Sequence, residues 1–427
     1  MSRALSPGAE ALSSPRGEPP VDRPAEWSVR AQLTGYLARL RGGEVGSMPV
    51  VVGLVALSLF FQSQNSNFLT AGNLTNLLVQ GSGVAMIAMG VVFVLLIGEL
   101  DLSVGSMAGV GGAVLARTVT GPHPHAWWIA IVLALLTGAA MGLVQGVLVT
   151  AVNLPSFVVT LAGLLAFNGI VLEAVNNTAR ASIRNSSQLV YIGNGLLSPA
   201  TGWLLAVAIT IGYAALQVLR RMRRLRLGLK PGPGLLVVWR VAVVAVVAVA
   251  VVLVTNADRG PLAPIRGLPF VVALVLLAMV VLSYIASRTA FGRHVYAVGG
   301  HAEAARRAGI KVQSVRVGVF MLSGVMATLG GIVLTTRLQS VTSTEGSGQI
   351  LLYAIAAAVV GGTSLFGGHG RVVNAVLGGL VVAAIDNGMG LLELSAGSKS
   401  IYTGIVLIAA VTIDSLSRRG RVSSGRG

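Results

Sequence analysis

The most restrictive feature of this sequence is a series of apolar runs separated by polar or basic segments. Each run is near the length of about 20 residues that an α-helix needs to cross the hydrocarbon core of a bilayer. Backbone polar groups inside a bilayer must be paired within the protein, so such a chain can span it only as a helical bundle or a closed barrel. The runs lie near 48–62, 79–98, 103–118, 127–150, 155–175, 201–219, 236–254, 268–287, 314–336, 350–366, 372–392 and 400–416.

Composition favours the bundle. The chain is 54% hydrophobic and 11% charged, whereas soluble domains carry about 25% charged residues. Its 55 Gly residues allow helices to pack closely, and the alternation of apolar and polar residues that marks a membrane barrel is lacking. We therefore predict an all-α, polytopic transmembrane bundle of about 10–12 spans. The runs at 350–366 and 372–392 could be half-helices or re-entrant segments.

Basic residues predict the orientation of the chain. They are concentrated in 1–47, 220–230, 288–316 and the tail, and the positive-inside rule places these segments and both termini in the cytoplasm. The basic residues that give the chain its net charge of +17 thus lie beside the spans. Without a basic groove or an aromatic stacking pattern, we expect membrane lipid and no nucleic acid as a partner.

Three parts follow from this pattern. Residues 1–47 form a cytoplasmic extension, partly disordered over its Pro- and Ser-rich start, with an interfacial helix from about Glu26. A transmembrane domain covers 48–416 and includes a cytoplasmic loop at 288–316. Residues 417–427 form a basic cytoplasmic tail.

The loop at 288–316 contains an unusual segment, HAEAARRAGI, over 301–310. Small residues surround Glu303, Arg306 and Arg307, and Gly309 is a helix stop signal. This pattern predicts a short surface helix. Such a helix could dock a cytosolic partner, or it could be a solvated helix at the membrane surface.

Two breaks interrupt the apolar runs. Glu99 and Asp101 end the first, and ionisable residues there indicate function by default. Asp101 or Ser103 could instead cap a helix that begins near Val104. In the second break, Gly361 and Gly362 lead into Thr363 and Ser364. Gly-interrupted segments in both halves of a transporter-like chain indicate a central pathway.

Other polar residues have alternative interpretations. Asp386 and Asn387 lie in an apolar run, where they could bind a polar substrate or join two helices. His123 and His125 could bind a metal, but they lie beside Trp127 and Trp128, which is typical of an exterior loop.

The sequence lacks the motifs of an enzyme. It has no Cys, no phosphate-binding loop and no triad or zinc-ligand arrangement. We expect no catalytic residue, no metal and no cofactor. The energy source for transport would then be an ion gradient or another polypeptide, and few acids lie inside the apolar runs to relay protons. A membrane-embedded enzyme using His123 and His125 is a further alternative.

The chain resembles the membrane permeases of bacterial sugar ABC importers, the family of the ribose and xylose permeases. The resemblance runs from about residue 50 to 416, and the extra apolar pair at 201–219 and 236–254 is nearer to the xylose type. The segments that carry it are ELDLSVGSMAG (99–109), LPSFVVTLAGLLAFNGI (154–170), TAFGRHVYAVGGHAEAARRAGI (289–310), AVVGGTSLFGG (358–368) and DNGM (386–389).

The resemblance implies a non-enzymatic transport subunit in the bacterial cell membrane. Sugar would arrive on an extracytoplasmic binding protein and pass between two permease subunits, in a homodimer, driven by a separate ATPase. Xylose or a related pentose is the expected cargo, with ribose, galactose, a nucleoside or a quorum signal as alternatives. The implied ATPase-coupling residues are Glu303, Ala304, Ala305, Arg306 and Gly309. Our candidates for the pathway or gate are Glu99, Asp101, Ser103, Thr363 and Asn387.

One segment departs from the family pattern. Where relatives commonly carry an acidic pair before an Ile-Ala-Ala sequence, this chain has Leu351 and Tyr353. If those acids open the outer gate or receive the binding protein, this chain does so differently.

Overall fold

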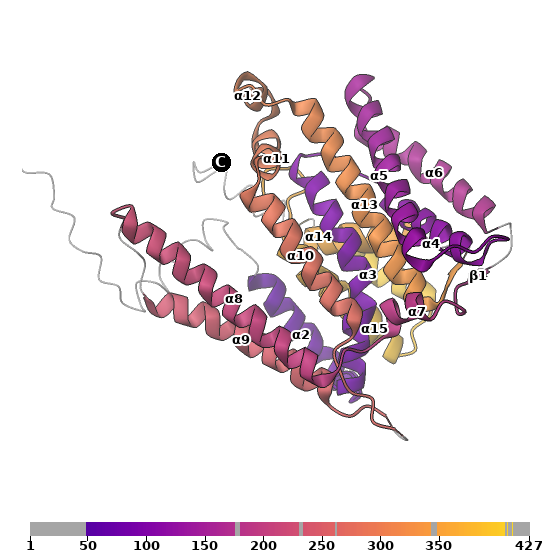
Figure 1. Cartoon of the computed structure of the whole chain (residues 1–427), viewed down its shortest axis with the longest axis vertical. Helices are drawn as coiled ribbons and strands as arrows, with labels where there is room; N and C mark the ends of the chain where they lie inside the picture. The colour runs from indigo at the N-terminus through magenta and orange to yellow at the C-terminus, as the bar shows by residue number, and fades with distance from the viewer. Residues whose placement is uncertain are drawn as a thin grey trace, which may run out of the picture.

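A computed structural model describes residues 48–175, 180–229, 234–260, 263–342 and 348–405, together with 408 and 412. The extension at 1–47 and the tail at 417–427 therefore lie outside the described residues. The described part is a helical bundle (Figure 1). Eight of its helices are long and apolar enough to cross a membrane, which confirms the all-α polytopic prediction. They are α3 (Ala71–Leu96), α5 (Trp127–Ala151), α6 (Ser156–Ala174), α8 (Pro199–Arg226), α9 (Gly234–Asn256), α10 (Phe270–Arg288), α13 (Val312–Leu338) and α15 (Val372–Leu391).

Shorter elements complete the described fold. The helices α2 (Met48–Gln64) and α14 (Gly348–Val360) are apolar but shorter, and β1 (Arg180–Ser182) pairs antiparallel with β2 (Ser340–Thr342). The remaining helices are α4 (Val104–Thr120), α7 (Ser187–Asn194), α11 (Ala290–Gly300) and α12 (Ala302–Arg307).

Most predicted runs coincide with helices, and three boundaries differ by several residues. α8 continues to Arg226 rather than ending near 219, because the basic segment after the apolar run is still helical. α3 begins at Ala71 rather than near 79, because the Thr70 hydroxyl accepts a hydrogen bond from the Asn73 N–H and caps it. α14 ends at Val360 rather than at 366, because Gly362 adopts a positive φ of 98°. The last predicted run, 400–416, is helical as far as residue 405, and most of its remainder lies outside the described residues.

Small residues bring the central helices together. α13 packs against α3, α4 and α5 in the middle of the bundle. On α5, Gly138, Gly142 and Gly146 recur every four residues and face α13. A side chain added at Gly142 would overlap the carbonyl oxygen of Phe320. Such small-residue stripes let helix backbones approach closely in a bilayer, where lipid tails remove the usual hydrophobic drive for association.

Gly142→Ala is therefore expected to destabilise the bundle. The added methyl group has no space, and overpacking typically costs about 1–3 kcal/mol. Gly212→Ala in α8 is the matched control, because no atom lies within 4 Å of the Cβ it would add. Thermal unfolding in detergent should show a lower midpoint for Gly142→Ala and an unchanged or slightly raised midpoint for Gly212→Ala. Equal shifts in the two variants would contradict close packing of α5 on α13.

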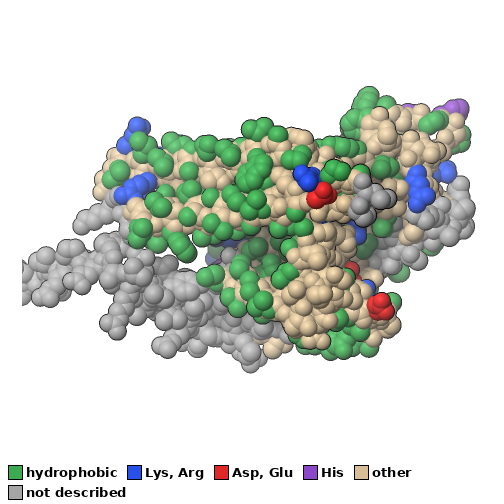
Figure 2. All heavy atoms as spheres, turned by 90° about the horizontal axis from the view of Figure 1, so that it is seen from below, with side chains coloured by type: hydrophobic (Ala, Val, Ile, Leu, Met, Phe, Trp, Pro, Cys, Tyr) green, Lys and Arg blue, Asp and Glu red, His purple; other side chains and the backbone are tan. Residues whose placement is uncertain are grey.

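α8 and α9 form a hairpin beside the main bundle (Figure 1). Most of their side chains are exposed, Leu204 and Trp239 among them. Figure 2 shows hydrophobic side chains spread over the visible face among other side chains and backbone. The exposed apolar side chains of α8 and α9 are suited to contact with lipid tails. Arg259, just after α9, donates to the Thr75 hydroxyl on α3 at 2.9 Å and so attaches the hairpin to the bundle.

Candidate functional site

The segment between α10 and α13 contains two helices, α11 and α12, at one end of the bundle (Figure 1). We call α11 and α12 the coupling segment, after the role that the resemblance implies for this loop. α12 confirms the predicted short helix: the His301 ring accepts a hydrogen bond from the Ala304 N–H at 3.1 Å, and Gly309 follows with φ of 84°. The Ile310 N–H bonds to the Ala305 carbonyl and closes the C-terminal turn. Sequence reasoning missed α11 because its 11 residues form no long apolar run.

The side chains of α12 fall on two faces. Ala305 is buried, so it anchors the helix to the bundle rather than contacting a partner. Glu303 and Ala304 are exposed. Glu303 forms ion pairs with Arg306 at 3.3 Å and Arg307 at 3.4 Å. Exposed ion pairs contribute little to stability, so these charges can exchange partners at small cost.

The first break follows α3. Gly98 has φ of 75°, its N–H bonds to the Leu95 carbonyl, and the Glu99 N–H reaches back to the Val94 carbonyl. This C-terminal turn satisfies the last carbonyls of the helix and lets the chain change direction. α4 then begins at Val104 with Ser103 as its N-cap residue.

Asp101 is held inside the protein at this break, with a relative exposure of 3%. One carboxylate oxygen accepts from the Ser103 N–H at 2.9 Å and from the Ser103 hydroxyl at 2.7 Å. The other accepts from the Ser323 hydroxyl on α13 at 3.1 Å. Gln145 on α5 donates to the Ser103 oxygen at 2.8 Å. This carboxylate cluster (Asp101, Ser103, Gln145, Ser323) links the break to α5 and α13.

The capping interpretation of Asp101 and Ser103 requires correction. The Ser103 side chain makes no cap hydrogen bond to the first turn of α4. Asp101 instead accepts a hydrogen bond from the backbone N–H of Ser103, which is the N-cap residue. The Asp101 carboxylate therefore holds the bend before α4 and does not cap the first-turn N–H groups of that helix.

Glu99 has a partner that sequence reasoning did not identify. Its carboxylate lies 3.1 Å from the Arg316 guanidinium on α13, and the two side chains are 15% and 28% exposed. From the sequence, Arg316 was only one of several basic residues in the predicted loop at 288–316. The pair joins the first break to the part of α13 nearest α12, and its partial burial makes it stronger than the exposed pairs of α12.

The second break has the same turn geometry. After α14, the Gly362 N–H bonds to the Val359 carbonyl and the Thr363 N–H to the Ala358 carbonyl. Thr363 is fully buried, and its hydroxyl has no hydrogen-bond partner within the described part of the chain.

The two breaks meet each other and the coupling segment. The Gly368 N–H donates to the Leu96 carbonyl at 2.9 Å. A side chain added at Gly299, at the end of α11, would overlap that same carbonyl. Tyr296 of α11 donates its hydroxyl to the Gly370 carbonyl at 2.9 Å. Gly367 lies against both Gly98 and Gly299, since a Cβ added there would be 3.1 Å from the Gly98 nitrogen and 3.0 Å from the Gly299 carbonyl oxygen. We call the contact of Gly98, Gly299, Gly367 and Gly368 the glycine junction.

Asn387 lies apart from the breaks. Its side-chain oxygen accepts from the Asn73 amide at 2.8 Å and joins α15 to the start of α3. Of the five pathway candidates, Glu99, Asp101 and Ser103 share the first break and Thr363 lies in the second. Asn387 is a contact between helices at the opposite end of the bundle from α12.

A second polar group occurs near that opposite end. The Tyr353 hydroxyl on α14 donates to Asp386 on α15 at 3.2 Å, and the Gln349 amide donates to the Tyr353 oxygen at 3.0 Å. Arg337, near the end of α13, interacts electrostatically with Asp386. Tyr353, one of the two residues that depart from the expected acidic pair, thus contacts an acid on the neighbouring helix.

These features define a multi-pass helical membrane protein, with a capped surface helix at one end and two broken helices that meet beside it. Residues 73–411 match the family described as the permease component of branched-chain amino acid transport systems. The chain belongs to this family.

Curated relatives agree with this assignment. The chain is 35% identical to the xylose transport system permease protein of Escherichia coli K12, over 93% of this chain and 98% of that protein. It is 34% identical to the xylose permease of Haemophilus influenzae, over 86% and 94%. The ribose import permease protein of Escherichia coli K12 is 31% identical, over 85% and 92%. No solved structure matches. The resemblance to sugar permeases is confirmed.

Proposed function

We propose that this chain is the membrane permease subunit of an ATP-driven sugar importer in a bacterial plasma membrane, with xylose or a related pentose as its cargo. The match to xylose permeases along nearly their whole length supports this cargo. Ribose, galactose or a nucleoside would fit the same importer class, and the ribose permease is a more distant relative.

The coupling segment is the observation that carries the proposal. α12 is an exposed, capped helix whose charged side chains, within the part of the chain that the structure describes, form ion pairs with one another. A separate ATPase would dock on Glu303, Ala304 and Arg306, with Ala305 and Gly309 holding the helix in place. α11 touches both breaks through Gly299 and Tyr296. Closure of an ATPase pair would thus move α11 and both breaks together.

The bonding of the buried acid argues against an ion-coupled transporter. Asp101 accepts hydrogen bonds from Ser103 and Ser323, and Glu99 is paired with Arg316. A proton relay needs a series of exchangeable acids or histidines, and these two carboxylates are held as structural acceptors. Sugar would arrive on an extracytoplasmic binding protein and pass between two copies of this chain, with both termini in the cytoplasm.

Glu303→Arg tests the docking role. We expect the variant to insert normally but to lose co-purification with its ATPase, because a contact charge is reversed on an exposed face. Buried contacts of the bundle are undisturbed, since Glu303 lies outside the core. Glu393→Arg is the matched control, because it makes the same charge change on an exposed residue just after α15, at the end away from α12.

Normal ATPase co-purification and normal transport in Glu303→Arg would overturn docking at α12. Glu303→Gln separates loss of contact from loss of helix, because it keeps the side-chain length while removing the ion pairs. An intermediate loss of ATPase binding is expected for Glu303→Gln.

A further inference from the structure

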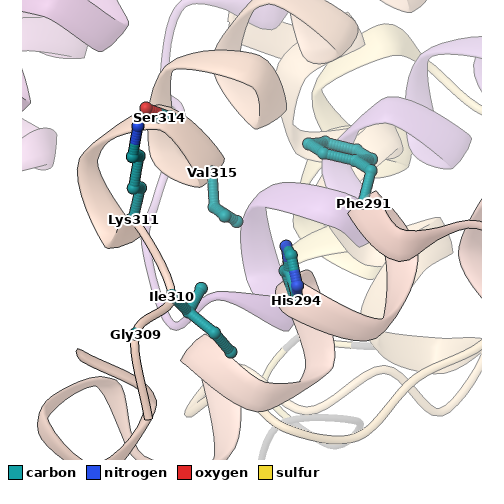
Figure 3. Close-up of a pocket in the computed structure, with 7 residues that line it drawn as sticks. All are labelled: Phe291, His294, Gly309, Ile310, Lys311, Ser314 and Val315. Atoms are coloured by element: carbon teal, nitrogen blue, oxygen red, sulfur yellow. The ribbon is translucent and has the colours of Figure 1, made fainter. Parts of the chain in front are cut away.

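A groove runs along one side of α13, starting beside the coupling segment. Its first part is a cavity of about 440 Å³ between α11 and the first turn of α13 (Figure 3). Its second part, of about 300 Å³, lies between α5, α10 and α13. Phe291 lines both parts and therefore marks where they join.

The two parts lie one after the other along α13, with the Phe291 ring between them. Ser314 lines the first part, and Gly318, Met321 and Val325 line the second. These residues are spaced by four, three and four positions, so they share one helix face. From Lys311 to Val325 the helix rises about 21 Å at 1.5 Å per residue. One leaflet is about half of the roughly 30 Å hydrocarbon core, so the groove is long enough to run from the interface through a leaflet.

The chemistry of the groove changes along this path. Lys311 and Ser314 are exposed at its mouth, and the His294 ring lies opposite them across the cavity in Figure 3. Within the described residues, no carboxylate lies within ion-pair distance of Lys311 or His294. Beyond Phe291 the lining side chains are apolar and include Ala139 of α5. A cationic, hydrogen-bonding mouth leads into an apolar slot.

We propose that this groove binds one anionic phospholipid. Its phosphate would lie at Lys311 and His294, with Ser314 as a hydroxyl donor, and an acyl chain would lie in the apolar slot beside Met321 and Val325. A Lys at the membrane surface attracts anionic lipid, and the apolar slot favours a hydrocarbon chain over water. Because the mouth lies between α11 and α13, a bound lipid would bridge the coupling segment to the core of the bundle.

Gly318 fixes the width of the slot. A Cβ added there would lie 2.9 Å from the Phe291 ring, which already covers this face of the helix. A leucine side chain at position 318 would displace this ring toward the slot that the acyl chain would occupy. Gly318→Leu therefore tests whether the acyl chain needs the slot. Replacing Lys311 and His294 tests whether the mouth attracts the phosphate.

Native mass spectrometry of the delipidated full chain tests the proposal, with palmitoyl-oleoyl phosphatidylglycerol and the phosphatidylcholine of the same acyl chains as probes. We expect one tightly bound phosphatidylglycerol. The Lys311→Gln, His294→Gln double variant should lower that affinity at least about tenfold, equivalent to about 1.4 kcal/mol. Arg293→Gln should leave it within about twofold, because Arg293 is an exposed base of α11 outside the groove.

Equal binding of the two lipids would overturn the anionic specificity. An equal loss in Arg293→Gln would show general charge attraction and would also overturn the site. If Gly318→Leu changes the oligomeric state and leaves lipid affinity intact, a second copy of the chain occupies the groove and the proposal fails. Should Gly318→Leu not fold, the double variant and its control decide. These measurements need neither ATPase nor sugar, so their failure leaves the proposed function intact.

Discussion

Gly299→Ala is expected to abolish most transport while the ATPase remains bound. The added methyl group would overlap the Leu96 carbonyl oxygen, where the end of α11 meets the first break. Overpacking costs about 1–3 kcal/mol. If this strain falls on one of the two conformations of the transport cycle, the rate should fall by about tenfold or more, since 1.4 kcal/mol is a tenfold change.

The adjacent residue provides the control. A Cβ at Gly300 would have no atom within 4 Å, so Gly300→Ala is expected to transport at the normal rate. The measurement is sugar uptake together with ATPase co-purification for both variants. Loss of ATPase binding in Gly299→Ala would show that the residue shapes α12 rather than relaying its movement. Equal transport by the two variants would contradict the glycine junction as a link in coupling.

Asp101→Ala is expected to destabilise the bundle strongly. It removes the acceptor for the Ser103 N–H, the Ser103 hydroxyl and the Ser323 hydroxyl. A buried donor left without a partner costs about 1–3 kcal/mol, and a lost side chain leaves a cavity as well. Thermal unfolding in detergent should show a markedly lower midpoint and little folded protein at physiological temperature.

Asp101→Asn separates hydrogen bonding from charge. The amide oxygen can still accept from Ser103, and the amide nitrogen can donate to the Ser323 oxygen, so stability should be close to normal. Our account also expects most transport to remain, because Asp101 acts as an acceptor that holds the break. A stable Asp101→Asn variant without transport would give the carboxylate a charge-dependent role and would favour the ion-coupled alternative.

Local sequence signals predicted much of the fold. Apolar run lengths located most helices because a run near membrane-spanning length forms one helix, and Gly309 marked the end of α12 because a positive φ suits glycine. The predicted run at 79–98 starts after the true beginning of α3, because Asn73 and Thr75 lower the hydropathy of the first turns of this helix. In the structure these side chains are paired, with Asn387 and Arg259 respectively. Polar residues left outside the apolar run thus attach α3 to α15 and to the segment after α9.

The site was less predictable because its contacts are distant in sequence. The breaks at Gly98 and Gly362 could each be recognised from glycine inside an apolar run. The contact between the two breaks, through Leu96 and Gly368, is a tertiary contact that local sequence patterns cannot predict. The same holds for the bond of Asp101 to Ser323, 222 positions away. Periodicity assigns residues to helices, but it does not state which helices are neighbours.

The most direct test of the central claim is xylose uptake by proteoliposomes. They would hold this chain with its candidate ATPase, carry ATP on the ATPase side, and receive the sugar-binding protein and labelled xylose on the other. Our account predicts uptake that requires ATP and the ATPase, and that continues when ionophores collapse every ion gradient. Uptake that proceeds without the ATPase and stops with the ionophores would contradict it.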